Sequence, residues 1–216
     1  MKTISACVQE LLIQQPFLEE AISRQIINYS ALAEELQPTI ATMLKKPVKS
    51  GAIMMALRRF QPPQRLRSEK KLKASLQQLG DITVRSRLVD FTFQNSSSLV
   101  HSHAQILEVI NPKAFYAFSR GLYESNLVVS ESELPLVETK FSEEKLLGRQ
   151  DQLSAISIRL PENNSEIPGL YYHIFKRFAW EGISLYEVIS TTNEFTVLVK
   201  DHIVDLAFGI IKNLKA

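Results

Sequence analysis

Cysteine, glycine and long apolar runs are scarce in this sequence of 216 residues. The single cysteine, Cys7, excludes an internal disulfide and a cysteine-rich metal cluster, and we expect it to be a small buried side chain. The seven glycines form no Gly-rich phosphate loop. No run approaches the ~18 apolar residues that a membrane span needs, and the N-terminus lacks a secretory signal. These absences predict a cytoplasmic protein with no membrane partner.

Residues that commonly carry catalysis are few and poorly placed. His101 and His103 would point to different sides of a helix, and no carboxylate or cysteine stands where a zinc site would need it. His173 lies beside apolar neighbours, which is typical of a structural histidine. The serine run 96–98 lacks the Gly-x-Ser-x-Gly turn of a hydrolase nucleophile. We therefore predict that the chain is not an enzyme and has no catalytic residue, metal or cofactor.

The C-terminal stretch 153–216 has the most regular pattern, which predicts strand, helix, strand, strand and helix. An alternating strand precedes a helix that we expect to start with Pro168 as its first residue and to stop at Gly182. Strands at 183–190 and 195–199 follow, and then a last helix. The apolar faces of the two helices are Leu170, Ile174 and Phe178, and Val204, Ala207, Ile211 and Leu214.

This stretch resembles an ACT domain, and specifically the kind found in the regulatory region of aspartokinases. The resemblance lies in the Pro-Gly-Leu helix entrance at 168–170, in Trp-Glu-Gly-Ile-Ser-Leu at 180–185, and in 188–192 followed by 194–197. It implies a ferredoxin-like βαββαβ unit that senses an amino acid. The chain has neither the length nor a motif for the kinase domain of those enzymes.

A weaker copy of the pattern lies about 70 residues upstream. Val89, Phe91 and Phe93 alternate as a strand, a helix begins near Leu99 and ends at 111–112, and 115–119 and 126–130 predict a hairpin across 120–121. Leu99 matches Leu170, Ser119 matches Ser190, and Val129 matches Val199, with one residue lost in the hairpin. After Ser130 the apolar pattern is broken, so we expect a degenerate unit without a clear second helix.

The predicted ligand site is the helix entrance of the second unit together with the end of a facing strand. Free N–H groups at a helix start suit a carboxylate, and carbonyl groups at a strand end can receive an ammonium group, so an amino acid fits both. Alternatively, Pro168 and Gly169 serve only a tight turn. The candidate residues are Glu166, Ile167, Pro168, Gly169, Leu170, Ile189, Ser190 and Thr191, with Asn95, Ser97 and Ser98 as their counterparts in the first unit.

Charge divides the chain. Residues 1–80 carry twelve basic and six acidic residues, a net charge of +6, whereas the remainder carries thirteen basic and seventeen acidic residues, a net charge of −4. Such a basic block suits phosphate contacts with nucleic acid, although a solvated charged face or linker is the alternative. The candidate nucleic-acid-binding residues are Lys45, Lys46, Lys49, Arg58, Arg59, Arg65 and Arg67.

The first 60 residues predict several short helices. We expect helices at 4–14 and from Pro16, a helix at 31–36 capped by Ser30 and broken at Gln37-Pro38, and further helices at 39–46 and 48–60. The segment 29–36 with its following turn and helix resembles the helix-turn-helix or winged-helix domains of prokaryotic transcription regulators. That resemblance implies that the basic residues beside the later helix grip DNA phosphates.

The predicted architecture is α+β, with a helix-turn-helix-like module at 1–64, a basic linker helix at 65–80, a degenerate ACT-like unit at 81–146 and a second ACT-like unit at 147–216. Leu66, Leu72, Leu76 and Leu79 would give the linker helix a seam toward a partner subunit or the sensor. The predicted function is a homodimeric transcription regulator that binds double-stranded DNA and responds to an amino-acid effector. The alternative is a free-standing regulatory subunit that docks on an amino-acid biosynthetic enzyme and does not bind DNA.

Overall fold

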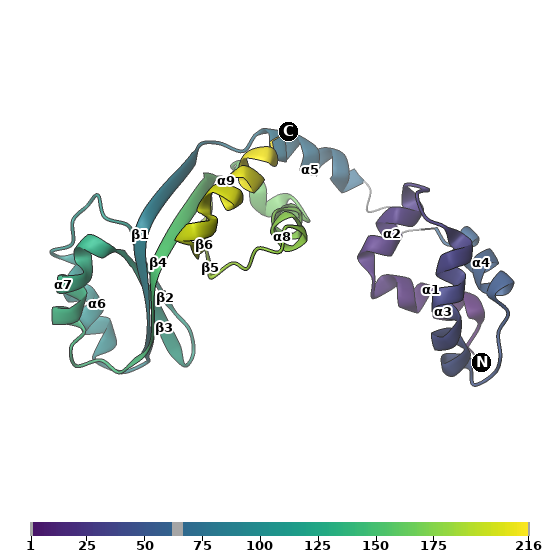
Figure 1. The fold of residues 1–216 in the computed structure, drawn as a ribbon, viewed down its shortest axis with the longest axis horizontal. Helices are drawn as coiled ribbons and strands as arrows, with labels where there is room; N and C mark the ends of the chain where they lie inside the picture. Colours follow the sequence, from purple (N-terminus) through teal and green to yellow (C-terminus); the bar gives the residue numbers. More distant parts are fainter. Residues whose placement is uncertain (1, 62–66, 216) are drawn as a thin grey trace. The chain divides into compact units, whose positions relative to one another are not determined.

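The computed structural model describes residues 2–61 and 67–215, with the backbone alone described for 67–70. The chain divides into two compact units, Met1–Arg67 and Ser68–Ala216, which we call the helical unit and the sheet unit (Figure 1). Each has its own buried core.

The helical unit contains α1 (Ile4–Ile13), α2 (Pro16–Ser23), α3 (Tyr29–Leu44) and α4 (Ser50–Arg59). Cys7 is fully buried in its core, as predicted. The other buried members are Val8, Leu12, Ile22, Leu32, Ala33, Leu36, Ile40, Val48, Ile53, Ala56 and Leu57. Every helix except α2 contributes at least three of these side chains, so the unit is stabilised mainly by burial of one face of each helix.

Two details of α3 contradict the sequence predictions. The cap is Asn28 and not Ser30, because the Asn28 side chain accepts hydrogen bonds from the backbone N–H groups of Ser30 and Ala31 at 3.1 and 3.2 Å. The helix also continues through Pro38. A proline removes only one backbone donor, its ring here lies on the exposed face, and Leu36 and Ile40 on either side are buried. Tertiary burial therefore outweighs the local cost of the proline.

The sheet unit is built on six antiparallel strands in the order β2-β3-β1-β4-β6-β5. The hairpin predicted across residues 120–121 is confirmed as β2 and β3, whereas the strand predicted at 183–190 forms only at its end, as β5. The strands are β1 (Ile82–Gln94), β2 (Tyr116–Arg120), β3 (Glu124–Ser130), β4 (Leu146–Arg159), β5 (Glu187–Ser190) and β6 (Glu194–Lys200).

The long strands β1 and β4 are shared between the two halves of this sheet. The end of β1 pairs with β3 and the end of β4 pairs with β6, whereas the start of each long strand pairs with the end of the other. Irregular register marks the crossing, where Arg87 and Gln152 both have a φ of 59°. The fourth strand of each half is thus supplied by the long strand of the other half.

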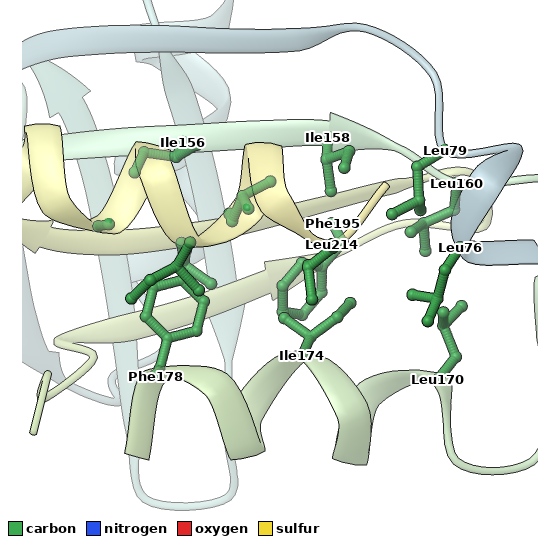
Figure 2. Packing of buried hydrophobic residues seen from close by; sticks show 14 of the residues in the cluster. Leu76, Leu79, Ile156, Ile158, Leu160, Leu170, Ile174, Phe178, Phe195 and Leu214 are labelled. Carbon is green, nitrogen blue, oxygen red and sulfur yellow. The ribbon is translucent and has the colours of Figure 1, made fainter. Parts of the chain in front are cut away.

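Four helices cover the sheet, two for each half. In Figure 1, α6 (Leu99–Leu107) and α7 (Leu134–Lys140) lie on one side of the strands, and α8 (Leu170–Trp180) and α9 (Val204–Asn213) lie on the other. Short 3₁₀ turns precede α7, α8 and α9, at Glu131–Glu133, Asn164–Glu166 and Asp201–Ile203. The predicted helix faces are largely confirmed, since Leu170, Ile174 and Phe178 point from α8 into the core (Figure 2).

The helix α7 corrects the expectation that the first copy lacks a second helix. Val137 in α7 and Phe141 directly after it are both buried. They stand 70 residues before Ala207 and Ile211, which are buried side chains of α9. The hairpins also match at an offset of 70, because Ala117 pairs with Val128 as Glu187 pairs with Leu198. Ser119 therefore matches Ile189 and not Ser190, and the residue lost between the copies lies before the hairpin.

The basic helix after the helical unit, α5 (Arg67–Gln77), packs on the sheet unit. Leu76 and the following Leu79 are 6% and 5% exposed in the core that α8 and α9 cover, and Leu72 packs against it (Figure 2). Of the two directions predicted for this seam, a partner subunit or the C-terminal units, the one toward the C-terminal units is observed. Leu66 lies outside the described residues.

Candidate functional site

The predicted ligand loop of the second half precedes α8. The prediction that Pro168 is the first helical residue is wrong. The helix α8 starts at Leu170, and Gly169 occupies the cap position with a φ of 87°. This left-handed conformation favours glycine. No side chain caps the helix, so the first N–H groups of α8 depend on backbone, water or a ligand for their acceptors.

Two side chains that the sequence reasoning missed join this loop to the β5–β6 hairpin. Asn164 is 6% exposed, and its amide donates to the carbonyl groups of Pro161 at 2.8 Å and Thr192 at 2.6 Å. The hydroxyl groups of Tyr171 and Ser190 lie 2.9 Å apart. The loop and the strand end that were predicted to form one site are therefore neighbours.

The predicted ligand residues do not all present their side chains at this place. Glu166, Pro168, Gly169, Ser190 and Thr191 are exposed there. Ile167 and Leu170 are 7% and 1% exposed in the core, so only their backbone groups are available, and Ile189 packs against the cluster between the halves of the sheet. The loop thus offers mostly backbone groups and the hydroxyl of Ser190.

The equivalent loop of the first half is tied to its own hairpin in a similar way. Asn95 donates to the carbonyl of Gly121 at 2.9 Å and accepts from the hydroxyl of Ser125 at 2.6 Å. Ser97 and Ser98 are exposed at the start of α6. Here, however, the buried carboxylate of Glu144 accepts hydrogen bonds from Ser96 in the loop and from Ser102 in the first turn of α6.

The basic residues of the helical unit surround the connection between α3 and α4. Lys45, Lys46 and Lys49 are exposed there, and the Gln37 side chain fixes the connection by donating to the carbonyl of Val48 at 2.7 Å. On α4, Arg58 and Arg59 are also exposed, with the Arg58 guanidinium 5.9 Å from the ring centroid of Tyr29. Arg65 lies outside the described residues, and for Arg67 only the backbone, at the start of α5, is described.

These five exposed cations are available to an anionic partner. Among the side chains described in 2–61 and 71–215, none pairs as an acid with Lys45, Lys46, Lys49, Arg58 or Arg59. Arg59 donates only to the backbone carbonyl of Met55. A surface with uncompensated positive charge favours anion binding, whether the anion is a nucleic acid or an acidic protein.

A pair of carboxyl groups between the two halves of the sheet was not predicted. Asp90 on β1 is 1% exposed and accepts a hydrogen bond from the Tyr186 hydroxyl at 3.3 Å. Burial raises the pKa of Asp90, and burial together with the nearby Asp90 charge raises the pKa of Glu187 to about 7. Asp90 lies between Val89 and Phe91 on β1, so its side chain is on the opposite face of the strand from theirs.

Neither a metal site nor a membrane span is formed by the described part of the chain. No group of three or more described His, Cys, Asp or Glu side chains in 2–61 and 67–215 could hold a metal ion. His103, one of the histidines considered above for a zinc site, instead stacks on Phe118 with ring centroids 4.0 Å apart, and burial lowers the pKa of its imidazole. No helix in these ranges is both long and apolar enough to cross a membrane.

The architecture is similar to that of aspartate kinase regulatory proteins. The regulatory subunit of aspartate kinase from Thermus thermophilus matches 63% of this chain over 98% of its own length, with a TM-score of 0.50 and 10% identity. A structure of aspartokinase alpha and beta subunits matches 63% over 97% of its length, with a TM-score of 0.52 and 12% identity. The fold is ACT-like.

The aspartate kinase from Clostridium acetobutylicum also matches, with a TM-score of 0.53 and 12% identity over 62% of this chain. That match covers 34% of the length of the kinase. No known family profile and no curated protein matches the sequence. The ACT-like fold agrees with the ACT resemblance found in residues 153–216 of the sequence.

Proposed function

We propose that this chain is an amino-acid-responsive regulator in which the sheet unit senses the amino acid and the helical unit binds DNA. The observation that carries the sensing role is the loop before α8, which is joined to the β5–β6 hairpin by Asn164 and begins an uncapped helix within an ACT-like fold. In this proposal the two halves of the sheet are two ACT-like units; in support, each half has four strands in the ferredoxin-like order and two helices.

The loop suits both ends of a free amino acid. The first N–H groups of α8 carry partial positive charge and attract a carboxylate. On the facing hairpin, carbonyl groups and the hydroxyl of Ser190 can accept hydrogen bonds from an ammonium group. The exposed candidates at this place are Glu166, Pro168, Gly169, Ser190 and Thr191.

Amino-acid sensing is tested by measuring the melting temperature of the full chain with each proteinogenic amino acid in turn. One of them should raise the melting temperature of the sheet unit in the wild type, and the rise should disappear in Asn164→Ala, which frees the loop from the hairpin. Asn163→Ala is the matched control, because Asn163 is the exposed neighbour of the buried Asn164. An unchanged melting temperature with every amino acid would contradict the sensing role.

DNA binding is supported by the five exposed cations around the α3–α4 connection and on α4. In a dimer, two such surfaces would double the number of phosphate contacts. Affinity for DNA should fall steeply with salt, and replacing Lys45, Lys46 and Lys49 with Gln should reduce the log-log slope by about 3 for each chain that contacts DNA, and therefore by about 5–6 for a dimer that uses both surfaces. A triple Lys→Gln variant at Lys113, Lys145 and Lys212 of the sheet unit is the control with equal net charge. Equal salt slopes for the two triple variants would contradict this role.

A second candidate function is a free-standing subunit that docks on a biosynthetic enzyme. The observation in its favour is the match to an aspartate kinase regulatory subunit that is itself a separate chain. An amino-acid response in the melting experiment, together with no salt-sensitive retention of DNA, would favour this alternative.

A further inference from the structure

Glu144 follows α7 and lies against the first turn of α6. Its side chain is 8% exposed, and its two carboxylate oxygens accept hydrogen bonds from the hydroxyls of Ser96 at 2.7 Å and Ser102 at 2.9 Å. The loop 95–98 was predicted as the ligand loop of the first half. It already binds a carboxylate, and this carboxylate is the side chain of Glu144 of the same chain.

The hydroxyl groups around this carboxylate are oriented by the same contacts. Because Ser96 donates its proton to Glu144, it must accept from the hydroxyl of Ser98 at 3.0 Å and from the N–H of Leu99 at 2.9 Å. Burial by itself would raise the pKa of Glu144, but the neighbouring serine hydroxyls, mainly those of Ser96 and Ser102, lower it below its usual value. The arrangement therefore holds an ionised carboxylate at the positive end of a nine-residue helix.

The second half shows that the fold does not require this polar cluster. At the offset that aligns Leu99 with Leu170, Ser96 matches Ile167, and at the offset that aligns α7 with α9, Glu144 matches Leu214. Ile167 and Leu214 are 7% and 5% exposed in the apolar core (Leu214 is seen in Figure 2). Where one half contains serine and a carboxylate, the other therefore packs two aliphatic side chains.

We infer that the first turn of α6 is a carboxylate-binding site whose resident ligand is the side chain of Glu144. The site is complete within the chain, with a donor for each carboxylate oxygen. It is closed to a free amino acid as long as Glu144 occupies it. If the proposed sensing role holds, each chain then binds its effector at the loop before α8 and not at both loops.

Chemical rescue tests this site. Glu144→Ala removes the resident carboxylate and leaves the serine donors without an acceptor, so the melting temperature of the sheet unit should fall. Sodium acetate at about ten times its dissociation constant should then raise it by about 3–6 °C relative to sodium chloride of equal ionic strength. The wild type should show no such difference between the two salts, and neither should Glu143→Ala, which removes the exposed neighbouring carboxylate.

A second variant separates occupation of the site from general effects of acetate. Glu144→Gln fills the same space without charge, so acetate should leave its melting temperature unchanged. Methylammonium chloride, which supplies the other charged end of an amino acid, should not rescue Glu144→Ala. If Glu144→Ala is unfolded in chloride, acetate should restore its circular dichroism spectrum.

Two results would overturn the inference. One is equal behaviour of Glu144→Ala in acetate and chloride, folded or unfolded, and the other is an equal effect of acetate on Glu144→Ala and Glu144→Gln. Failure of the proposed sensing role is a different result, because it would appear as a wild type that no amino acid stabilises while the acetate rescue persists.

Discussion

The stability of the sheet unit should fall as the pH rises through neutrality, because of Asp90 and Glu187. The buried oxygen atoms Asp90 Oδ1 and Glu187 Oε2 have no hydrogen-bond partner among the described residues. With the pKa of Glu187 raised to about 7, this carboxyl group is protonated in the folded protein at mildly acidic pH. At higher pH Glu187 ionises, and its half-buried negative charge lies beside the buried carboxyl group of Asp90.

The sign and size of the effect follow from the raised pKa. Glu187 titrates at about 7 when folded and near its ordinary value of 4.5 when unfolded. Its contribution is fully present below the unfolded pKa and is lost as the pH rises through the folded one. Between about pH 5 and about pH 8 the free energy of unfolding of the sheet unit should therefore fall by about 2 kcal/mol, after a small reduction for the partial exposure of Glu187. The raised pKa of Asp90 acts in the same direction.

The assay is the free energy of unfolding of the sheet unit, measured against pH for the wild type and Glu187→Gln. The glutamine keeps the shape of a protonated glutamate, so the two proteins should be equally stable near pH 5 and the variant about 2 kcal/mol more stable near pH 8. The lowered pKa of His103 contributes stability that is lost as the pH falls. Because this contribution is the same in both proteins, it cancels in the difference between the wild type and Glu187→Gln. Glu181→Gln on the exposed surface is the control. Parallel curves for wild type and Glu187→Gln would refute the reasoning.

Three further predictions concern stability. Gly169→Ala should destabilise the sheet unit by about 1–2 kcal/mol, because of its φ of 87°, whereas Gly209→Ala inside α9, where an added Cβ meets nothing within 4 Å, should stabilise it by about 0.5–1 kcal/mol; chemical denaturation of both variants checks this, and the same sign for both would contradict it. Phe178→Ala should cost about 3–5 kcal/mol, since the ring is 1% exposed; a loss below about 1 kcal/mol would show that this core collapses around the gap. Asn28→Ala should destabilise the helical unit by about 1 kcal/mol through loss of the α3 cap, as measured by calorimetry, with no change in the sheet unit.

Periodicity predicted the elements whose apolar side chains face one core. The helix α8 is the clearest case, since Leu170, Ile174 and Phe178 are spaced four apart and all three are buried. The β2–β3 hairpin was found for the same reason, with a glycine at its turn. In these segments local pattern and tertiary burial agree.

The length of β1 and the existence of α7 depend on tertiary pairing. Residues 82–86 show only a short apolar alternation, Ile82 and Val84, and they form a strand because β4 supplies an edge for their backbone groups. The helix α7 has only seven residues, too few for a periodic signal. In α3, similarly, the core contacts of Leu36 and Ile40 decide that the helix passes Pro38.

The sequence predicted that the helix start and the strand end of the candidate site lie together, from the chemistry of their backbone groups and from the ACT resemblance. The structure places the two segments side by side, and their role in ligand binding stays a prediction. The side chains that join them, Asn164 and Tyr171, could not be found from spacing, because their partners lie about 20 to 30 positions away in the sequence. The role of Glu144 was missed for the same reason, since Ser96 is 48 residues from it.

The crossing of β1 and β4 has a consequence for how this protein can be divided. The start of β1 pairs with the end of β4 in the second half, and the start of β4 pairs with the end of β1 in the first half. A fragment that ends at residue 145 would therefore expose an unpaired edge on β1. A fragment that begins at residue 146 would lack the β1 segment that forms the outer strand of the second half. We expect both fragments to aggregate when expressed alone and to recover the native sheet only when mixed during refolding. Because each half needs a strand segment of the other, recombination that replaces one half alone is disfavoured in evolution, and the two halves should be inherited together.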